Sequence, residues 1–141
     1  MEGPEPYRTD LTEVGMRPVV RPASSPEKVV EAEKFVLRDA SGRSRAVLTV
    51  SADGSPVLAL SDQDGTTRAT LAVSADGSPG LDLADKEGKL RAWLTVLADG
   101  SPGLVLYDRS GKTRVALTVA VDGRPGLALY DEDGRVSWSA P

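Results

Sequence analysis

Apolar and polar residues alternate along most of the chain, in short runs separated by polar connectors that contain glycine. From residue 35 onward this pattern recurs every 23 residues, with units that start near residues 35, 57, 80, 103 and 126, the last one truncated. Each unit has one alternating run before a D-x-x-G connector and a second run before a D-G-x-P connector. Period-two alternation is typical of half-buried strands, so each unit is predicted to be a β-hairpin.

The connectors carry the chemistry of tight turns. In D-x-x-G, as at Asp62 and Gly65, the aspartate can cap the backbone of a type I turn and the glycine can take a positive φ. In D-G-x-P, as at residues 76–79, Asp-Gly turns the chain and the proline marks the first residue of the next strand. Both ends of every strand are therefore specified locally.

The alternation also predicts one continuous apolar face. Leu58 and Leu60 of one run point to the same side, and Ala69, Leu71 and Val73 of the next run match them. A sheet with such a face needs a second layer, supplied by closure into a barrel, by a solenoid-like stack or by association of several copies. Association as a trimer is favoured, because small aliphatic layers suit three sheets at a narrow axis, whereas a ten-stranded barrel needs larger residues inside.

The predicted fold class is therefore all-β, a meander or solenoid-like sheet of tandem hairpins over residues 35–141 that homo-oligomerisation completes. Residues 1–34 are rich in proline and poor in core residues, which predicts a non-globular arm that is disordered or orders on a partner. Within this arm Ser25 and Pro26 form a helix start signal, enough for one or two turns.

Composition narrows the range of functions. The net charge is −4 and the pI about 4.9, which argues against nucleic acid or an anionic membrane as a partner. The chain has no His and no Cys, so the commonest general base and thiolate metal sites are missing, and neither an enzyme nor a cofactor is expected. With no signal-peptide pattern and no long apolar run, a cytoplasmic or virion-associated location is expected. Ile and Asn are absent and Arg outnumbers Lys, which indicates a GC-rich bacterial or phage genome and a thermostable protein.

Two sets of polar residues resemble binding sites. The connectors at 62–65 and 131–134 begin like calcium loops, which makes Asp62, Asp64, Asp131 and Asp133 weak calcium candidates, although the other units lack the second carboxylate. The aligned arginines could grip sulfated or phosphorylated polymers, but neutralisation by the aligned aspartates of the same turns is the favoured interpretation. The arginine row consists of Arg45, Arg68, Arg91 and Arg114.

Large side chains gather toward the C-terminus. Trp93, Tyr107 and Tyr130 fall on the face opposite the leucines, and packing is favoured over ligand stacking for them. Leu97 adds to the same apolar region, and Trp138 falls on the leucine-bearing phase, where it would close the open end of the core. These five residues are the candidates for an interface or a ligand site.

The units resemble bacterial repeat proteins built on L-x-L-x-D-x-x-G-x-x-R-A-x-L-x-V-x-x-D-G-x-P. This resemblance implies a β-repeat fold, and it implies no particular activity, because none is assigned to those proteins. More loosely they are similar to YD (Rhs-type) repeats, whose YD-x-x-G-R pattern matches residues 107–112 and 130–135. Arg38, Ser61 and Ala84 stand where that pattern has tyrosine, which argues against a toxin-enclosing shell. Both resemblances cover residues 35–141 only.

Together these features favour a non-enzymatic structural or assembly protein. It would self-associate through the β-repeat body and dock through residues 1–34 to a larger protein assembly such as a virion, fibre or surface layer. The alternative is a module that binds glycans or another ligand with its aromatic C-terminal face.

Overall fold

The computed structural model describes residues 7–10, 19–22 and 29–140 of the chain. The chain divides into two units, Met1–Glu31 and Ala32–Pro141. In the first unit, β1 (Tyr7–Asp10) pairs antiparallel with β2 (Val19–Pro22), a ribbon that the sequence pattern does not indicate. The helix start signal at Ser25 and Pro26 lies outside the described residues, and residues 29–33 form no regular element.

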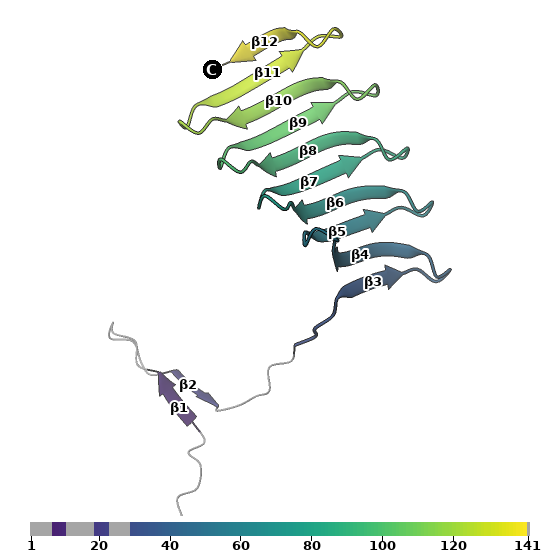
Figure 1. Cartoon of the computed structure of the whole chain (residues 1–141), viewed down its shortest axis with the longest axis vertical. Helices are drawn as coiled ribbons and strands as arrows, with labels where there is room; N and C mark the ends of the chain where they lie inside the picture. The colour runs from purple at the N-terminus through teal and green to yellow at the C-terminus, as the bar shows by residue number, and fades with distance from the viewer. Residues whose placement is uncertain (1–6, 11–18, 23–28, 141) are drawn as a thin grey trace, which may run out of the picture. The chain divides into compact units, whose positions relative to one another are not determined.

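The second unit is one open antiparallel sheet of ten strands, in which every strand pairs with its neighbours in sequence (Figure 1). The hairpins form a ladder, and the described part of the chain contains no helix. The predicted all-β meander is confirmed. The sheet is open, because β3 and β12 are its outermost strands and do not pair with each other. The strands are β3 (Lys34–Arg38), β4 (Ser44–Val50), β5 (Pro56–Ser61), β6 (Thr67–Val73), β7 (Pro79–Ala84), β8 (Leu90–Val96), β9 (Pro102–Tyr107), β10 (Thr113–Val119), β11 (Pro125–Tyr130) and β12 (Val136–Ala140).

The D-x-x-G connectors are three-residue hairpin loops. In the turn between β5 and β6, Gly65 N donates to Asp62 O at 3.1 Å and Asp62 N donates to Thr66 O at 2.9 Å. Gly65 has a φ of +85°, the left-handed conformation that follows a type I turn in this kind of loop and that a side chain disfavours. The aspartate thus opens the turn and the glycine closes it, as the sequence predicts.

The D-G-x-P connectors have the same backbone geometry with the aspartate in another place. Ser74 N donates to Ser78 O and Gly77 N donates to Ser74 O, both at 2.9 Å. Asp76 now sits directly before the positive-φ glycine, and its Oδ1 accepts from Ser78 N at 3.0 Å. One loop type therefore joins the strands from β3 to β12. The two rows of turns, here called the D-x-x-G edge and the D-G-x-P edge, differ in the side chains that they carry.

The strand register collects the apolar residues into straight rows on one face, here called the leucine face. In the middle of this face a leucine in each strand from β4 to β11 lies directly opposite the leucine of the next strand, a set here called the central leucine row. It consists of Leu48, Leu58, Leu71, Leu81, Leu94, Leu104, Leu117 and Leu127.

A flanking row lies on each side of the central leucine row. Toward the D-G-x-P turns, valines pair with prolines, as Val73 does with Pro79. Toward the D-x-x-G turns, leucines alternate with alanines, as in the pair of Leu83 with Ala92, except that β10 has Val115 and β12 has Trp138 in this row. The sheet is therefore apolar over the full width of this face.

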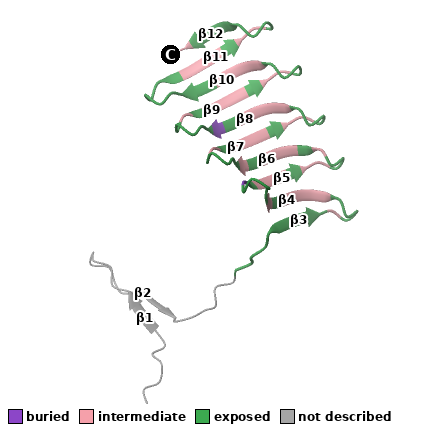
Figure 2. Cartoon of the chain, in the orientation of Figure 1, coloured by how far each residue is buried: buried purple, intermediate pink, exposed green. Residues whose placement is uncertain are grey.

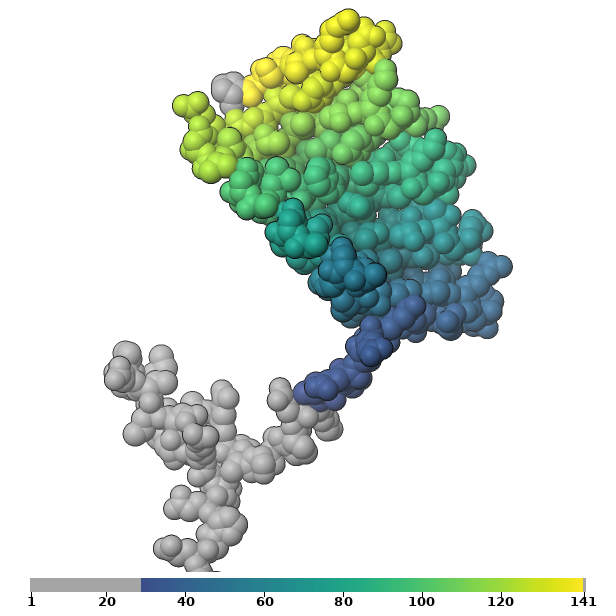
Figure 3. All heavy atoms as spheres, viewed as in Figure 1, coloured from purple at the N-terminus to yellow at the C-terminus, as the bar shows by residue number. Residues whose placement is uncertain are grey.

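The sheet is a single layer without an interior. Among residues 29–140 no apolar side chain is buried, and only Ser55 and Thr95 are buried at all, at 8 % and 6 % exposure (Figure 2). In the space-filling view the hairpins are stacked bands, one above the other from β3 to β12 (Figure 3). The layer that the apolar face requires does not come from the described part of the chain.

We expect Gly77→Ala to lower the free energy of unfolding by about 1 kcal/mol, because the alanine side chain disfavours the left-handed conformation. An added Cβ at Gly77 meets no atom within 4 Å, so the loss would come from the backbone conformation alone. Gly77→Asn should cost clearly less, since asparagine tolerates this conformation. Denaturant unfolding at one protein concentration measures both variants, and equal losses for Ala and Asn would contradict this account.

Candidate interaction surface

The leucine face is a continuous apolar surface on the described part of the chain. Along its central row, Leu71 is 52 % exposed and Leu94 is 49 % exposed. Strands lie about 4.8 Å apart and rise about 3.3 Å per residue, so ten strands of this length span roughly 900 Å². That is more than the largest apolar patch of a typical monomer and about the area that each partner contributes to a stable protein interface.

Two shallow hollows lie on the leucine face, one repeat apart. The first, of about 250 Å³, is lined by Leu71, Leu81, Leu94 and their valine and proline neighbours. The second, of about 140 Å³, uses Leu94, Leu104 and Leu117 in the corresponding positions. The central row therefore presents ridges and hollows at the interval of the repeat.

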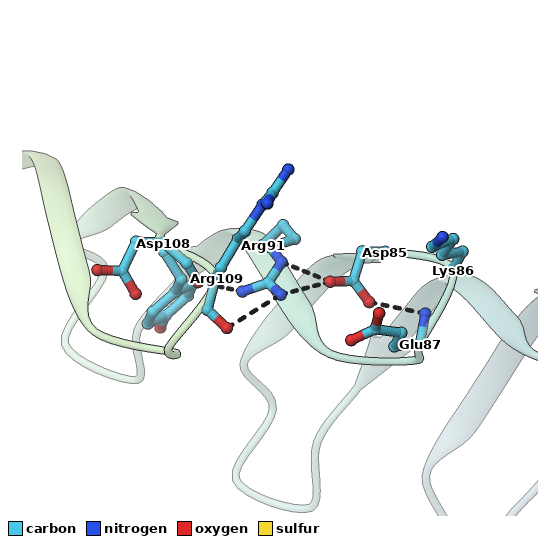
Figure 4. A pocket seen from close by; sticks show the side chains of 7 residues that line it. Asp85, Lys86, Glu87, Arg91, Asp108 and Arg109 are labelled. Carbon is cyan, nitrogen blue, oxygen red and sulfur yellow. Dashed lines mark hydrogen bonds and ion pairs between the residues drawn. The ribbon is translucent and has the colours of Figure 1, made fainter.

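The D-x-x-G edge is organised by its aspartates. Asp85 Oδ1 accepts from the backbone N–H groups of Glu87 and Lys89, at 2.9 and 3.1 Å. Asp85 Oδ2 accepts from Arg91 Nε at 2.8 Å and from a second guanidinium nitrogen (Figure 4). One oxygen thus caps the turn and the other fixes an arginine of the following strand.

Arg91 also reaches the next hairpin. Its guanidinium donates to the backbone carbonyl of Asp108, and Nη2 donates to Arg109 O at 3.3 Å (Figure 4). Each guanidinium of this kind bridges an aspartate of its own hairpin and a carbonyl of the next one, an arrangement here called an arginine staple. The other staples join Arg45 Nε to Ser61 O (3.1 Å), Arg68 Nε to Ala84 O (2.9 Å) and Arg114 to Asp131 O.

Half of this arrangement is predicted by the sequence. Aspartate–arginine pairing within each hairpin is present in all four units, in the pairs Asp39–Arg45, Asp62–Arg68, Asp85–Arg91 and Asp108–Arg114. The carbonyl of the next hairpin was missed, because only the sheet register brings it within reach. In β12, Ser137 stands where the other units have the staple arginine. Its hydroxyl donates to Leu129 O of the same hairpin at 3.1 Å, so this last described hairpin has no staple.

These contacts lower the pKa of several turn aspartates. For Asp108 the Ser110 hydroxyl is the largest cause, and partial burial opposes it. The Lys112 N–H and Arg114 lower the pKa further, so that it lies far below its ordinary value of 3.8. The Ser41 hydroxyl likewise lowers the pKa of Asp39. For Asp85, partial burial raises the pKa, but the N–H of Lys89 and Arg91 outweigh that effect. The carboxylates are thus held ionised by the turns that they cap.

The calcium candidates occupy the same turn positions. Asp62 Oδ1 accepts from the N–H groups of Asp64 and Thr66, at 3.0 Å each, and its Oδ2 pairs with Arg68. Asp131 Oδ1 accepts from Asp133 N and Arg135 N. Throughout the ranges that the structure describes, no three His, Cys, Asp or Glu side chains are grouped so that they could hold a metal ion.

The structure does not gather the aromatic candidates into one platform. Trp93 lies in the middle of β8, opposite Asp82 and Val105, and its Nε1 would be 3.4 Å from a Cβ at Gly80. Tyr107 lines a hollow with Arg91 and Arg109 at the end of β9.

Tyr130 lines a separate hollow with Lys112 and Asp133 at the end of β11. The two tyrosines therefore lie one repeat apart at the D-x-x-G edge, and Trp93 borders neither hollow.

The remaining two candidates lie in different places. Leu97 opens the turn after β8, where its N–H donates to Ser101 O at 2.9 Å, and it stands outside the rows of the leucine face. Trp138 is paired with Leu129 on the leucine face, in the flanking row toward the D-x-x-G turns. Trp138 is thus the one candidate that belongs to the leucine face.

The chain matches no known protein-family model, and no curated protein is similar to it in sequence. Within the described ranges, no helix is both long and apolar enough to cross a membrane.

Acidification below about pH 4 is expected to destabilise the sheet. A carboxyl with a lower pKa in the folded chain binds fewer protons when folded, so its stabilisation is complete above the unfolded pKa and is lost as the pH falls toward the folded pKa. Ser110→Ala should raise the pKa of Asp108 in the folded chain and so reduce the stabilisation that is lost on acidification, whereas the control Ser139→Ala should leave this loss unchanged. Thermal melting between pH 2 and 7 is the measurement, and identical acid limbs for Ser110→Ala and the parent would contradict the assignment.

Removal of one staple should loosen two neighbouring hairpins. Arg91→Ala is expected to lower the melting temperature by several degrees. Asp85→Asn should lower the melting temperature less in the Arg91→Ala background than in the parent chain, because the two residues share one interaction. Arg109→Ala is the matched control, since within the described residues its guanidinium makes no hydrogen bond or ion pair. A control as unstable as Arg91→Ala would show that charge alone, and not the staple, is responsible.

Proposed function

We propose that this chain is a non-enzymatic structural or assembly protein whose β-repeat body associates with copies of itself, with three copies favoured. Residues 1–34 would dock this body to a larger protein assembly such as a virion, fibre or surface layer. The leucine face is the self-association surface.

The observation that carries this proposal is the exposure of the central leucine row. Each of its leucines is half-buried or exposed, and full burial of a leucine side chain contributes about 2 kcal/mol. Covering the remaining exposed part of each leucine would still contribute about 1 kcal/mol, repeated in every strand from β4 to β11. A free monomer forgoes this stabilisation, whereas a second copy supplies an identical apolar surface.

The chemistry of the turns supports a structural role. The aspartates that open the D-x-x-G turns cap those turns, and four of them also hold arginine staples, so they serve the cohesion of the sheet. The chain also lacks His and Cys. Docking through residues 1–34 is supported by their proline-rich composition, which suits a segment that orders against a partner.

Leu94→Asp is expected to dissociate the assembly, because it places a carboxylate in the middle of the leucine face. Sedimentation velocity at several concentrations should show an oligomer for the parent chain and, for the variant, a dissociation constant raised at least tenfold.

Leu97→Asp is the matched control. Leu97 is 46 % exposed against 49 % for Leu94, and it lies in a turn outside the leucine face. The proposal predicts that this variant keeps the parent's oligomeric state. A parent chain that sediments as a monomer at high concentration would overturn self-association.

A further inference from the structure

We infer that three copies of the sheet associate in parallel and in register around one axis, as the three sides of a triangular prism with the leucine faces inward. This inference rests on the proposed self-association and adds the arrangement of the copies. It follows from the length of the strands, the order of side-chain sizes across the leucine face and the different charges of the two edges.

Strand length limits how many sheets can meet. A strand of six residues is about 20 Å long. The middle of each sheet would therefore lie roughly 6 Å from the axis in a three-sided prism, and about 10 Å from the axis in a four-sided one. Packed sheets lie about 10 Å apart, so one layer of side chains fills about 5 Å. Three sheets therefore close around leucine side chains, and four sheets leave a void.

The side chains vary in size as a prism requires. The space inside a three-sided prism is deepest toward the middle of each side and narrows at the corners. The central row is leucine in every strand from β4 to β11, and the flank toward the D-G-x-P turns consists of valine and proline. In the opposite flank, leucine alternates with the smaller alanine from β4 to β9 and with Val115 in β10. Two sheets packed face to face have a gap of uniform width, which the shorter flanks would leave partly empty.

The two edges of the sheet differ in net charge. The D-G-x-P turns hold Asp53, Asp76, Asp99 and Asp122, with Arg124 as their cation. The segments around the D-x-x-G turns (38–45, 61–68, 84–91, 107–114 and 130–137) hold eleven arginines and lysines against nine carboxylates, so this edge is slightly positive in sum, although the segments 61–68 and 130–137 are acidic by themselves. In a parallel ring every corner joins the acidic D-G-x-P edge to the D-x-x-G edge, whose sum of charges is slightly positive. An antiparallel pair related by an axis along the strands would instead place acidic edge against acidic edge.

Full overlap of the copies fixes the register. If one copy is shifted along the axis by one repeat, its ridges again meet hollows of its neighbour, but leucines at both ends become uncovered. The unshifted arrangement therefore buries the most apolar surface. All three copies of β3 then lie at the same end of the prism. The three segments that precede β3 thus start from one end, which would give a docking assembly three attachment points.

Crosslinking between turns tests this arrangement. The chain has no cysteine, so introduced thiols are unique. Gln63 lies in a D-x-x-G turn and Ala75 in the next D-G-x-P turn, both exposed and at opposite ends of β6. In the double variant Gln63→Cys/Ala75→Cys, a flexible bismaleimide should join residue 63 of one copy to residue 75 of its neighbour and yield covalent trimers.

Val121 provides the matched control. It holds the same turn position as Ala75 two repeats further on, which displaces it by about 19 Å along the sheet. Gln63→Cys/Val121→Cys should therefore yield little crosslinked product. Efficient crosslinking of this pair, or of Gln63→Cys alone, would overturn the in-register parallel ring.

Native mass spectrometry of the full chain separates the two levels of the proposal. Three times the chain mass of 14.8 kDa, together with crosslinks between residues 63 and 75, is the expected result. A dimer would overturn the prism and leave self-association in place. A monomer would overturn both.

Discussion

An antiparallel sheet has two faces, and a chain that folds only into consecutive hairpins has no further element to cover either of them. All of the described strands from β3 to β12 belong to one such sheet. Its two faces meet this constraint differently. The leucine face is apolar from edge to edge, whereas the opposite face mixes valines such as Val47, Val57 and Val105 with small, polar and aromatic residues.

Cohesion along the sheet comes from contacts between neighbouring hairpins only. Strand pairing supplies most of these contacts, and the arginine staples add a side-chain link from each hairpin to the next along one edge. Such a molecule behaves as a one-dimensional array, in which each hairpin depends on those beside it. The staples are local in this sense, since none of them reaches beyond the adjacent hairpin.

The opposite face is fitted together at its D-G-x-P side by small residues. Gly80, Gly103 and Gly126 alternate with Thr95 and Thr118 across neighbouring strands. A Cβ at Gly126 would lie only 3.2 Å from the Thr118 hydroxyl, and Thr95 is buried with its hydroxyl on Pro79 O at 2.9 Å. Larger side chains would clash at this side of the opposite face. The opposite face is thus closely packed within the chain, whereas the leucine face has no covering layer in the described residues.

Local chemistry allowed the hairpins, the turns and the leucine-bearing side of each strand to be predicted from the sequence by itself, because alternation, Asp caps and positive-φ glycines act within a few residues. The same locality made the Asp85–Arg91 pair predictable, since both residues belong to one hairpin. It could not reveal that Arg91 reaches the carbonyl of Asp108, or that Trp93, Tyr107 and Tyr130 fall in different places, because these depend on the register between hairpins. Only the tertiary structure decided that the sheet stays open and that its leucines form one uninterrupted row, because closure and alignment depend on many strands together. The turns and the alternation, in contrast, are determined by the residues of each hairpin.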